Sequence, residues 1–137
     1  MAKMSGLGWT TFTVEEADGT TARDLRNDIT NFALATPRGV QDVTGLDKSA
    51  IERILLLADL SLTLNGVFNP TAQKSHAVLR TVPSTSVARG TALAIASQTL
   101  SAEVLYTDYS ITRAADGSFV WTSPGVLSDG SVPTWGP

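Results

Sequence analysis

TDYSITRAADGSFVWTSPGVL, residues 107–127, has strand-forming residues on both sides of a central Asp116-Gly117 pair. An Asp-Gly pair tolerates the positive φ angles that a tight β-hairpin turn requires. Two more Asp-Gly pairs, at 18–19 and 129–130, each lie beside a run of strand-forming residues. We therefore expect a mainly β protein with a hairpin at 107–127.

Length and composition favour one domain spanning residues 1–137. The formal net charge is −3 and the ten Lys and Arg residues are scattered, which excludes a protein that holds nucleic acid through its phosphates. Without cysteine, neither a disulfide framework nor a thiolate metal site is available. The N-terminus lacks the apolar core of a secretory signal, and the longest apolar run, ILLLA, is far shorter than the ~20 residues that cross a bilayer. We expect a protein made in the cytoplasm that contacts no membrane.

Residues 54–64, ILLLADLSLTL, have the clearest strand pattern outside the hairpin. Every second residue of this range is apolar, and the intervening residues are polar from Asp59 onward, as in a half-buried strand. Asn65-Gly66 is expected to end this strand, because both residues favour turns. Residues 28–36 predict another strand.

Two helical segments are predicted. An S-x-x-E capping box at 49–52 favours a single helical turn over 49–53, directly before the strand. Asn69 is a suitable N-cap and Pro70 a suitable first helical residue, so the main helix is expected to begin there and to end near Arg80.

Two patterns concern how the strands pack. In VARGTALAIA, residues 87–96, alternate positions carry only Ala or Gly, so another backbone or the helix can approach that face closely, and we expect the helix to pack there. In residues 100–113 the apolar positions change phase after Tyr106. This change predicts a bulge or bend at a barrel corner or, in an oligomer, a strand that leaves its own core and covers a neighbour.

The chain offers little catalytic chemistry. His76 is the only histidine and no G-x-S-x-G motif is present, so a Ser-His-Asp triad is unsupported. Without cysteine or a second histidine, a zinc site is excluded. Glu15 and Glu16 are adjacent, so on a strand they would point to opposite faces. We therefore expect no enzyme and predict no catalytic, cofactor-binding or metal-binding residues.

Three segments have no evident role in a solitary domain. Residues 36–50 form a loop of about fifteen residues, longer than most connections in compact domains. The C-terminal segment, 123–137, is rich in Pro and Gly but contains Trp135, which would be an anchor if it docked on a partner. Residues 1–8 are interpreted as a flexible leader.

Three ordered phrases of the sequence suggest a family. RGVQDVTGLDKSAIERILLLADLSLTLNGVFN (38–69), SHAVLRTVPST (75–85) and YTDYSITRAADGSFVWTSPGVLSDGSVPTW (106–135) together resemble the tail tube, or major tail, proteins of bacteriophages with long non-contractile tails. The resemblance covers nearly the whole chain. It implies a two-sheet β-barrel or sandwich with one flanking α-helix, assembled as stacked hexameric rings that form a hollow tube.

By the same resemblance, residues 36–50 are an extended assembly loop that reaches an adjacent ring, and 123–137 contribute an interface. The candidate assembly contacts are Arg38, Gln41, Asp42, Asp47, Lys48, Val132 and Trp135. The implied partners are other copies of the chain, a tape-measure protein in the lumen, and the tail terminator and distal tail proteins. The implied location is the virion tail, after assembly in the cytoplasm of a bacterial host.

The implied function is a structural one, in which phage DNA passes through the tube during ejection without being bound. A lumen lined with carboxylates repels phosphates within a Debye length of roughly 8 Å, although the sequence does not assign the carboxylates that face inward. The alternative is a small β-sandwich module that binds a ligand such as a carbohydrate through Trp9 or Trp121.

Overall fold

The computed structural model of the chain describes residues 3 and 5–137. The described chain is mainly β, with α1 as its one α-helix. Its elements are η1 (Gly6–Gly8), β1 (Trp9–Glu15), β2 (Ala22–Asp24), β3 (Ile29–Ala35), β4 (Arg38–Asp42), β5 (Arg53–Ala58), β6 (Ser61–Val67), α1 (Ser75–Leu79), η2 (Val82–Ser84), β7 (Arg89–Ile95), β8 (Gln98–Tyr106), β9 (Ser110–Arg113), β10 (Phe119–Leu127) and β11 (Trp135–Gly136).

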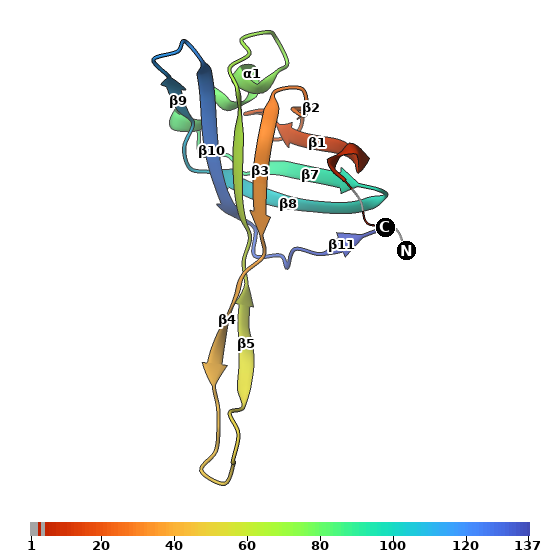
Figure 1. Cartoon of the computed structure of the whole chain (residues 1–137), viewed down its shortest axis with the longest axis vertical. Coiled ribbons are helices and arrows are strands. Elements are labelled where there is room, and N and C mark those ends of the chain that lie inside the picture. The colour runs from red at the N-terminus through yellow and green to blue at the C-terminus, as the bar shows by residue number, and fades with distance from the viewer. Residues whose placement is uncertain (1–2, 4) are drawn as a thin grey trace.

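Nine of the strands form one antiparallel sheet that folds over into two layers. The strand order is β2-β1-β7-β8-β10-β6-β3, with β9 paired to β10 and β11 paired to β8. In Figure 1, β1, β7 and β8 cross β10, β6 and β3 at a steep angle, with α1 at one end. The expected two-layer β-barrel or sandwich with one flanking helix is therefore confirmed. The remaining strands, β4 and β5, form a separate two-stranded ribbon.

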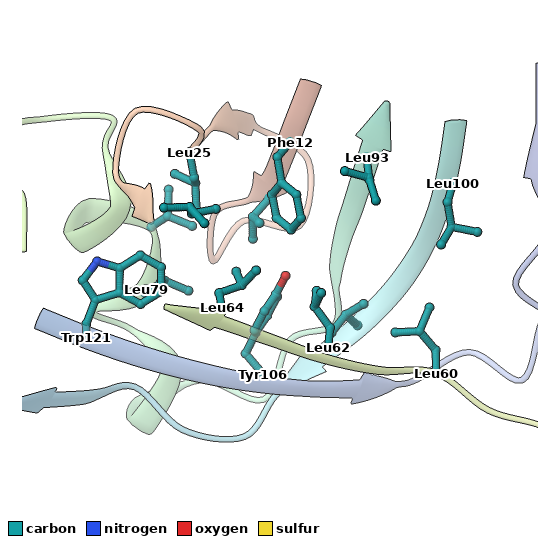
Figure 2. Packing of buried hydrophobic residues seen from close by; sticks show 14 residues of the cluster. Phe12, Leu25, Leu60, Leu62, Leu64, Leu79, Leu93, Leu100, Tyr106 and Trp121 are labelled. Carbon is teal, nitrogen blue, oxygen red and sulfur yellow. The ribbon is translucent and has the colours of Figure 1, made fainter. Parts of the chain in front are cut away.

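The core lies between the two layers and is built by alternation along the strands. On β6, Leu62 and Leu64 are buried, and on β1, Phe12 and Val14 are buried. Figure 2 shows side chains of the two layers pointing toward one another, with Trp121 of β10 at one end of the core. Burying such side chains contributes roughly 1.5–3 kcal/mol each, so the alternation stabilises this arrangement of the layers.

The predicted hairpin at 107–127 is confirmed. β9 and β10 pair with Phe119 opposite Arg113, and Gly117 in the turn has a φ of +93°. Asp116 Oδ1 accepts a hydrogen bond from the Ser118 amide at 2.9 Å, which closes the turn. The turn therefore forms as its Asp-Gly pair indicates.

The single strand predicted over 54–64 is wrong, because the range is divided between two strands. β5 ends at Ala58, β6 begins at Ser61, and β6 continues through the predicted turn at Asn65-Gly66. Gly66 therefore lies within β6. The Trp121 ring occupies the space that a side chain at position 66 would need, which explains why this position carries a glycine. A Cβ atom built on Gly66 would lie 2.6 Å from Trp121 Cζ2.

Both helix predictions need correction. No helical turn forms over 49–53, because the Thr44 hydroxyl accepts a hydrogen bond from the Glu52 amide at 2.8 Å and holds this segment in a hairpin. The main helix is limited to Ser75–Leu79. Gln73 has a φ of +68°, which a right-handed helix excludes, and Asn69 Oδ1 accepts from the Thr71 amide in a separate turn.

The small-residue face of 87–96 does not receive the helix. On β7, Arg89, Thr91 and Leu93 are buried in the core, and the Ala and Gly positions face outward. The apolar phase change in 100–113 is a bend between two strands: β8 keeps one phase to its end at Tyr106, and β9 begins at Ser110. The bend agrees with the first expected origin, and the exposed residues of β9 leave the second, a strand that covers a neighbour, as a prediction.

Candidate assembly surfaces

The ribbon of β4 and β5 projects away from the two-layer body (Figure 1). We call residues 38–58 the arm. Its register pairs Val40 with Leu55 and Asp42 with Arg53. The predicted loop at 36–50 is thus half of a longer hairpin, and the first part of the strand predicted at 54–64 supplies the other half.

The arm is apolar but exposed on both faces. Every residue from 38 to 57 is exposed except the half-buried Thr44. The exposed apolar side chains are Val40, Val43, Leu46, Ile51, Ile54, Leu55, Leu56 and Leu57. An isolated two-stranded hairpin is marginally stable at best in water, and exposed apolar patches of this kind mark interaction sites. The arm is therefore a candidate interaction surface.

Two predicted contact residues stabilise the arm from within. Arg38 donates to the Leu56 carbonyl from Nε at 2.9 Å and from Nη2 at 2.7 Å. Asp42 Oδ1 accepts from Thr44 Oγ1 at 2.6 Å and from the Thr44 amide at 2.9 Å. These hydrogen bonds, led by the one from the Thr44 hydroxyl, lower the pKa of Asp42. Both residues thus have a structural task that the sequence does not reveal.

The other three predicted residues of the arm are exposed. Gln41 lies on β4, and Asp47 and Lys48 lie in the loop that joins β4 to β5. Neither Asp47 nor Lys48 takes part in an ion pair among the described residues. They are therefore available to a partner. The exposed leucines beside them were not predicted as contact residues from the sequence.

The C-terminal segment folds back on its own chain. Residues 123–127 belong to β10, and β11 pairs with β8 so that Trp135 lies opposite Leu100. Trp135 remains 47% exposed. Val132 lines a hollow at the base of the arm together with Arg38 and Leu57. The structure thus brings Val132 and Arg38 together and leaves Trp135 apart from them.

The predicted leader at 1–8 lies partly outside the described residues. Of the described part, Gly6–Gly8 form the short helix η1, with Ser5 Oγ accepting from the Leu7 amide. The Ala96 amide donates to the Gly8 carbonyl at 2.9 Å, which ties this end of η1 to the body.

The outer face of β1, β7 and β8 forms a shallow acidic hollow. Glu15, Glu103 and Asp129 surround the small residues Gly90 and Ala92 there. Glu15 Oε1 accepts from the Gly90 amide at 2.6 Å. Partial burial, followed by the nearby charges of Glu15 and Asp129, raises the pKa of Glu103. The residues that line the hollow include three carboxylates and neither Lys nor Arg, and such a hollow repels anions.

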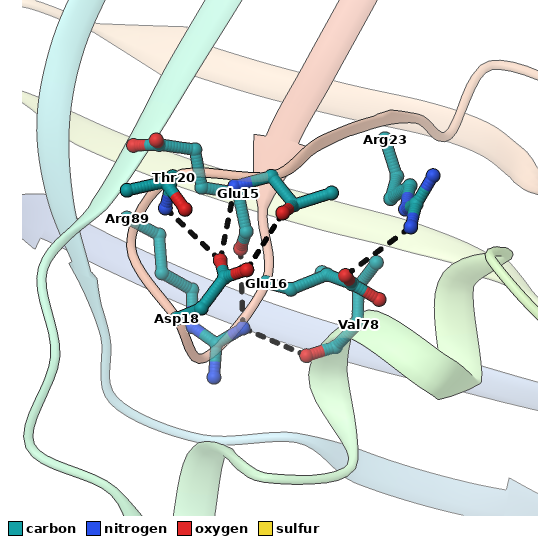
Figure 3. A network of polar contacts seen from close by, with 8 residues as sticks. Glu15, Glu16, Asp18, Thr20, Arg23, Val78 and Arg89 are labelled. Atoms are coloured by element: carbon teal, nitrogen blue, oxygen red, sulfur yellow. Dashed lines mark hydrogen bonds and ion pairs between the residues drawn. The ribbon is translucent and has the colours of Figure 1, made fainter.

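A buried arginine joins the layers beneath this hollow. Arg89 is 1% exposed and donates to the Val78 carbonyl at 2.7 Å, to the Glu15 carbonyl at 3.2 Å and to Thr81 Oγ1 at 2.8 Å. Figure 3 shows its guanidinium between β1 and the helix that carries Val78. Hydrogen bonds to a charged donor are worth roughly 1.5–3 kcal/mol each, so Arg89 fixes α1 against the sheet.

Of the two residues proposed for carbohydrate binding, Trp121 is buried, and Trp9 lines a hollow of about 280 Å³ with Ser5, Gly6 and Ile95. Trp121 is 1% exposed and donates from Nε1 to the Val67 carbonyl at 3.0 Å, so it is a core residue. Trp9 is half-buried against Phe12 and Phe32. The apolar cavity between the layers measures only about 20 Å³, whereas small-molecule sites measure ~300–1,000 Å³.

His76 packs between Phe68 and Tyr109, and its Nδ1 lies 3.1 Å from the Tyr109 hydroxyl.

Among residues 3 and 5–137, no three His, Asp or Glu side chains are placed to hold a metal ion together. In the same part of the chain, no helix has the length and apolar character needed to span a membrane.

Two solved structures share this architecture over nearly the whole chain. One is a chain of the "Tail of empty GTA particle computed with helical refinement, C6 symmetry", where GTA stands for gene transfer agent. It matches with a TM-score of 0.79 and 12% identity, over 98% of this chain and 100% of that chain. This is the fold of a virion tail protein. The tail-protein fold also occurs in a chain of the "Virion of native gene transfer agent (GTA) particle", with a TM-score of 0.75 and 12% identity, over 96% of this chain and 99% of that chain.

The tail-protein fold agrees with the architecture that the resemblance to tail tube proteins implies. No family model matches the sequence, and no curated protein matches it. At 12% identity the likeness lies in the backbone, not in shared residues. The arm and the acidic hollow are therefore interpreted below from this chain's own side chains.

Proposed function

We propose that the protein is the structural subunit of a tail tube, in which copies close into hexameric rings and the rings stack into a hollow tube. The observation that carries this proposal is the tail-protein fold, shared over 98% of the chain with a tail structure of six-fold symmetry. The protein thus acts by assembly and needs no active site.

Exposed strand edges support the closing of rings. β3 is the last strand of the order, so one side of its seven-residue backbone has no strand beside it among the described residues. At the other edge, β2 covers only part of β1. Unpaired edges of this length are templates for another chain, and pairing between neighbouring copies in a ring would satisfy them.

The arm supports the stacking of rings. It carries the predicted contact residues Gln41, Asp47 and Lys48 together with apolar side chains that a solitary molecule leaves in water. Trp135 and Val132 would add contacts from the C-terminal segment. An interface of this composition, apolar with a few charges, is typical of assemblies between identical subunits.

The acidic hollow suits the lumen. With the outer face of β1, β7 and β8 turned inward, each copy would present Glu15, Glu103 and Asp129 to the DNA that passes through the tube. These carboxylates would repel phosphates at short range and so prevent the DNA from binding to the wall.

The same role implies further partners: a tape-measure protein inside the growing tube, and terminator and distal tail proteins at its two ends. Assembly would take place in the cytoplasm of a bacterial host before the tail joins the virion. The runner-up function, a carbohydrate-binding module, has no support from the buried position of Trp121.

Negative-stain electron microscopy of the purified full chain at increasing concentration tests this proposal. We expect rings with six-fold symmetry, and tubes at the highest concentrations or when a tail initiation complex is added. Sedimentation velocity on the same samples should show the monomer disappearing as rings form. Single monomers under all of these conditions would contradict the proposed function, and glycan binding by such monomers would favour the runner-up.

A further inference from the structure

The sequence contains one Asn-Gly pair, Asn65-Gly66, and the fold places it within β6. An asparagine side chain reacts most easily with its own backbone when glycine follows it, because glycine has no side chain to obstruct the approach. At position 66 the Trp121 ring leaves no space for any other residue. The packing of the core therefore imposes a chemically labile pair on this strand.

The reaction open to this pair is deamidation. Hydroxide removes the Gly66 amide proton, and the Gly66 nitrogen then attacks Asn65 Cγ. A C–N bond forms, and the side-chain nitrogen takes a proton from water and leaves as ammonia. Water opens the resulting five-membered succinimide ring to aspartate or isoaspartate. Water is the only co-reactant, so the reaction needs neither an enzyme nor a cofactor.

The strand keeps the two reacting groups apart. β6 lies between β10 and β3, with Asn65 opposite Thr122 on one side and opposite Asn31 on the other. An extended strand directs a side chain out of the sheet, away from the peptide nitrogen that follows. The ring can form only after the backbone at Asn65 leaves the extended conformation. Cyclisation therefore requires β6 to separate from both neighbouring strands.

Two hydrogen bonds hold the Asn65 side chain in its outward position. Thr122 Oγ1 donates to Asn65 Oδ1 at 2.8 Å, and Asn65 Nδ2 donates to Asn31 Oδ1 at 2.7 Å. The Asn65 side chain is half-buried, which limits the access of competing water. Because both its oxygen and its nitrogen are engaged, the amide loses both bonds if it turns toward the Gly66 nitrogen.

We propose that Asn65 is a deamidation site that the fold protects, with Asn31 and Thr122 as the residues that hold its amide. Deamidation is then confined to chains in which β6 is open, and its rate follows the population of that open state. The protection operates within a single molecule and does not depend on the proposed function.

The isoaspartate product has a consequence for folding. It adds one carbon atom to the main chain at position 65, which interrupts the regular spacing of backbone hydrogen bonds between β6 and its two neighbours. A chain that remains unfolded is thereby converted into a form that does not rebuild β6. Folding and deamidation therefore compete for each new chain.

Peptide mapping by mass spectrometry tests the protection, because deamidation changes the mass of the peptide that contains Asn65. The full chain is incubated at mildly alkaline pH, once folded at a dilution where it is monomeric and once in guanidinium chloride. We expect deamidation of Asn65 to be at least about tenfold slower in the folded chain, since it requires β6 to open. Equal rates in the two samples would overturn the proposal.

Thr122→Val tests the hydrogen bonds to the amide, and Thr112→Val is the matched control. Thr112 lies on the exposed strand β9, where the same change removes no hydrogen bond to Asn65. We expect Thr122→Val to raise the deamidation rate of the folded chain about fivefold, the factor that corresponds to one ordinary hydrogen bond. The control should keep the natural rate. If Thr122→Val impairs folding, Asn31→Ala replaces it with the same expectation, and rates equal to the control would contradict the holding role of these residues.

Refolding yield tests the consequence for folding. The fraction of the natural chain that refolds should fall with time spent in guanidinium chloride at alkaline pH. Asn65→Thr should keep its yield, because threonine does not cyclise and retains a hydroxyl opposite Thr122. An equal loss of yield in both proteins would show that modification of Asn65 does not block refolding.

Discussion

Gly66 shows how one residue without a side chain can fix the position of a large one. A Cβ atom at this position would lie 2.5 Å from the Asp28 carbonyl oxygen and 2.6 Å from the Trp121 ring. The glycine has no positive φ, so the need is for space and not for an unusual backbone conformation. In the sequence, Asn65-Gly66 indicates a turn. A glycine that allows a positive φ in a turn and a glycine that makes room for a neighbouring side chain are the same letter in the sequence.

We therefore predict that Gly66→Ala lowers the free energy of unfolding by ~1–3 kcal/mol, since overpacking forces Trp121 or the backbone to move. Urea denaturation followed by tryptophan fluorescence measures this change. Gly39→Ala is the matched control, because Gly39 also lies in a strand and its added Cβ would meet only the flexible Leu56 side chain, at 3.4 Å. Equal stabilities of the two variants would show that the Trp121 contact is not tight.

Asp28 is the residue at which pH should act on the folded body. It is 4% exposed. Burial raises its pKa, but hydrogen bonds from Asn69 Nδ2 at 2.8 Å and from the Ser75 amide at 2.9 Å outweigh that effect, so the pKa is below its ordinary value. A carboxyl with a lowered pKa stabilises the fold above its unfolded pKa of about 3.9, and this stabilisation is lost as the pH falls through the folded pKa.

We expect stability to fall below about pH 4, and to fall less steeply in Asp28→Asn, which has no proton to gain. Thermal unfolding between neutral and acid pH measures both slopes. The variant should be less stable at neutral pH, because an amide accepts weaker hydrogen bonds than a carboxylate. Parallel pH profiles for the two proteins would remove Asp28 as the responsible group.

At the scale of elements, β5 and β6 are adjacent in the chain and similar in composition but have opposite environments. Leu57 of β5 is 91% exposed, whereas Leu62 of β6 is 2% exposed. The sequence indicates this difference only weakly: polar residues alternate with apolar ones from Asp59 onward, but not in residues 54–58. A strand that is apolar on both faces must be covered on both faces, but the described residues leave β5 exposed from Arg53 to Leu57.

Leu55→Ser/Leu57→Ser should therefore abolish tubes while changing the unfolding free energy of the body by no more than ~0.5 kcal/mol per substitution, as is usual for surface positions. Leu62→Ser in β6 is the contrasting variant. It should lower the unfolding free energy by ~3 kcal/mol or more, because it buries a hydroxyl and leaves a cavity. Electron microscopy and urea denaturation measure the two effects. Normal tubes from the double variant would mean that the arm leucines take no part in assembly.

For the whole molecule, the positions of the charged residues decide which face repels anions, and the net charge does not. A net charge of −3 is modest, but Glu15, Glu103 and Asp129 gather on one outer face of the sheet. These residues are far apart in the sequence. The antiparallel pairing of β1, β7 and β8 brings Glu15 and Glu103 together, and the Ser128 amide, which donates to the Glu103 carbonyl after β10, places Asp129 beside them. No local pattern predicts such a face, so the sequence leaves the lumen carboxylates unassigned.

If this face lines the lumen, Glu103→Lys should give tubes that retain DNA added during assembly, whereas the natural protein should give empty tubes. The retention should weaken at high salt, because it depends on screened charges. Nuclease protection of labelled DNA measures it. Glu52→Lys is the control, since it makes the same charge change on the exposed arm. Equal retention by both variants would place Glu103 elsewhere than the lumen.

The local sequence determined the β class and the hairpin at Asp116-Gly117, because turn chemistry and strand alternation are properties of neighbouring residues. Only the tertiary structure decided that β5 leaves the body, that α1 is one short helix and that the Ala and Gly face of β7 points outward. The reason is that a leucine or alanine has the same conformational preferences whether its strand lies in the core or is exposed. Its burial depends on whether a second layer lies opposite, and strands distant in the sequence supply that layer.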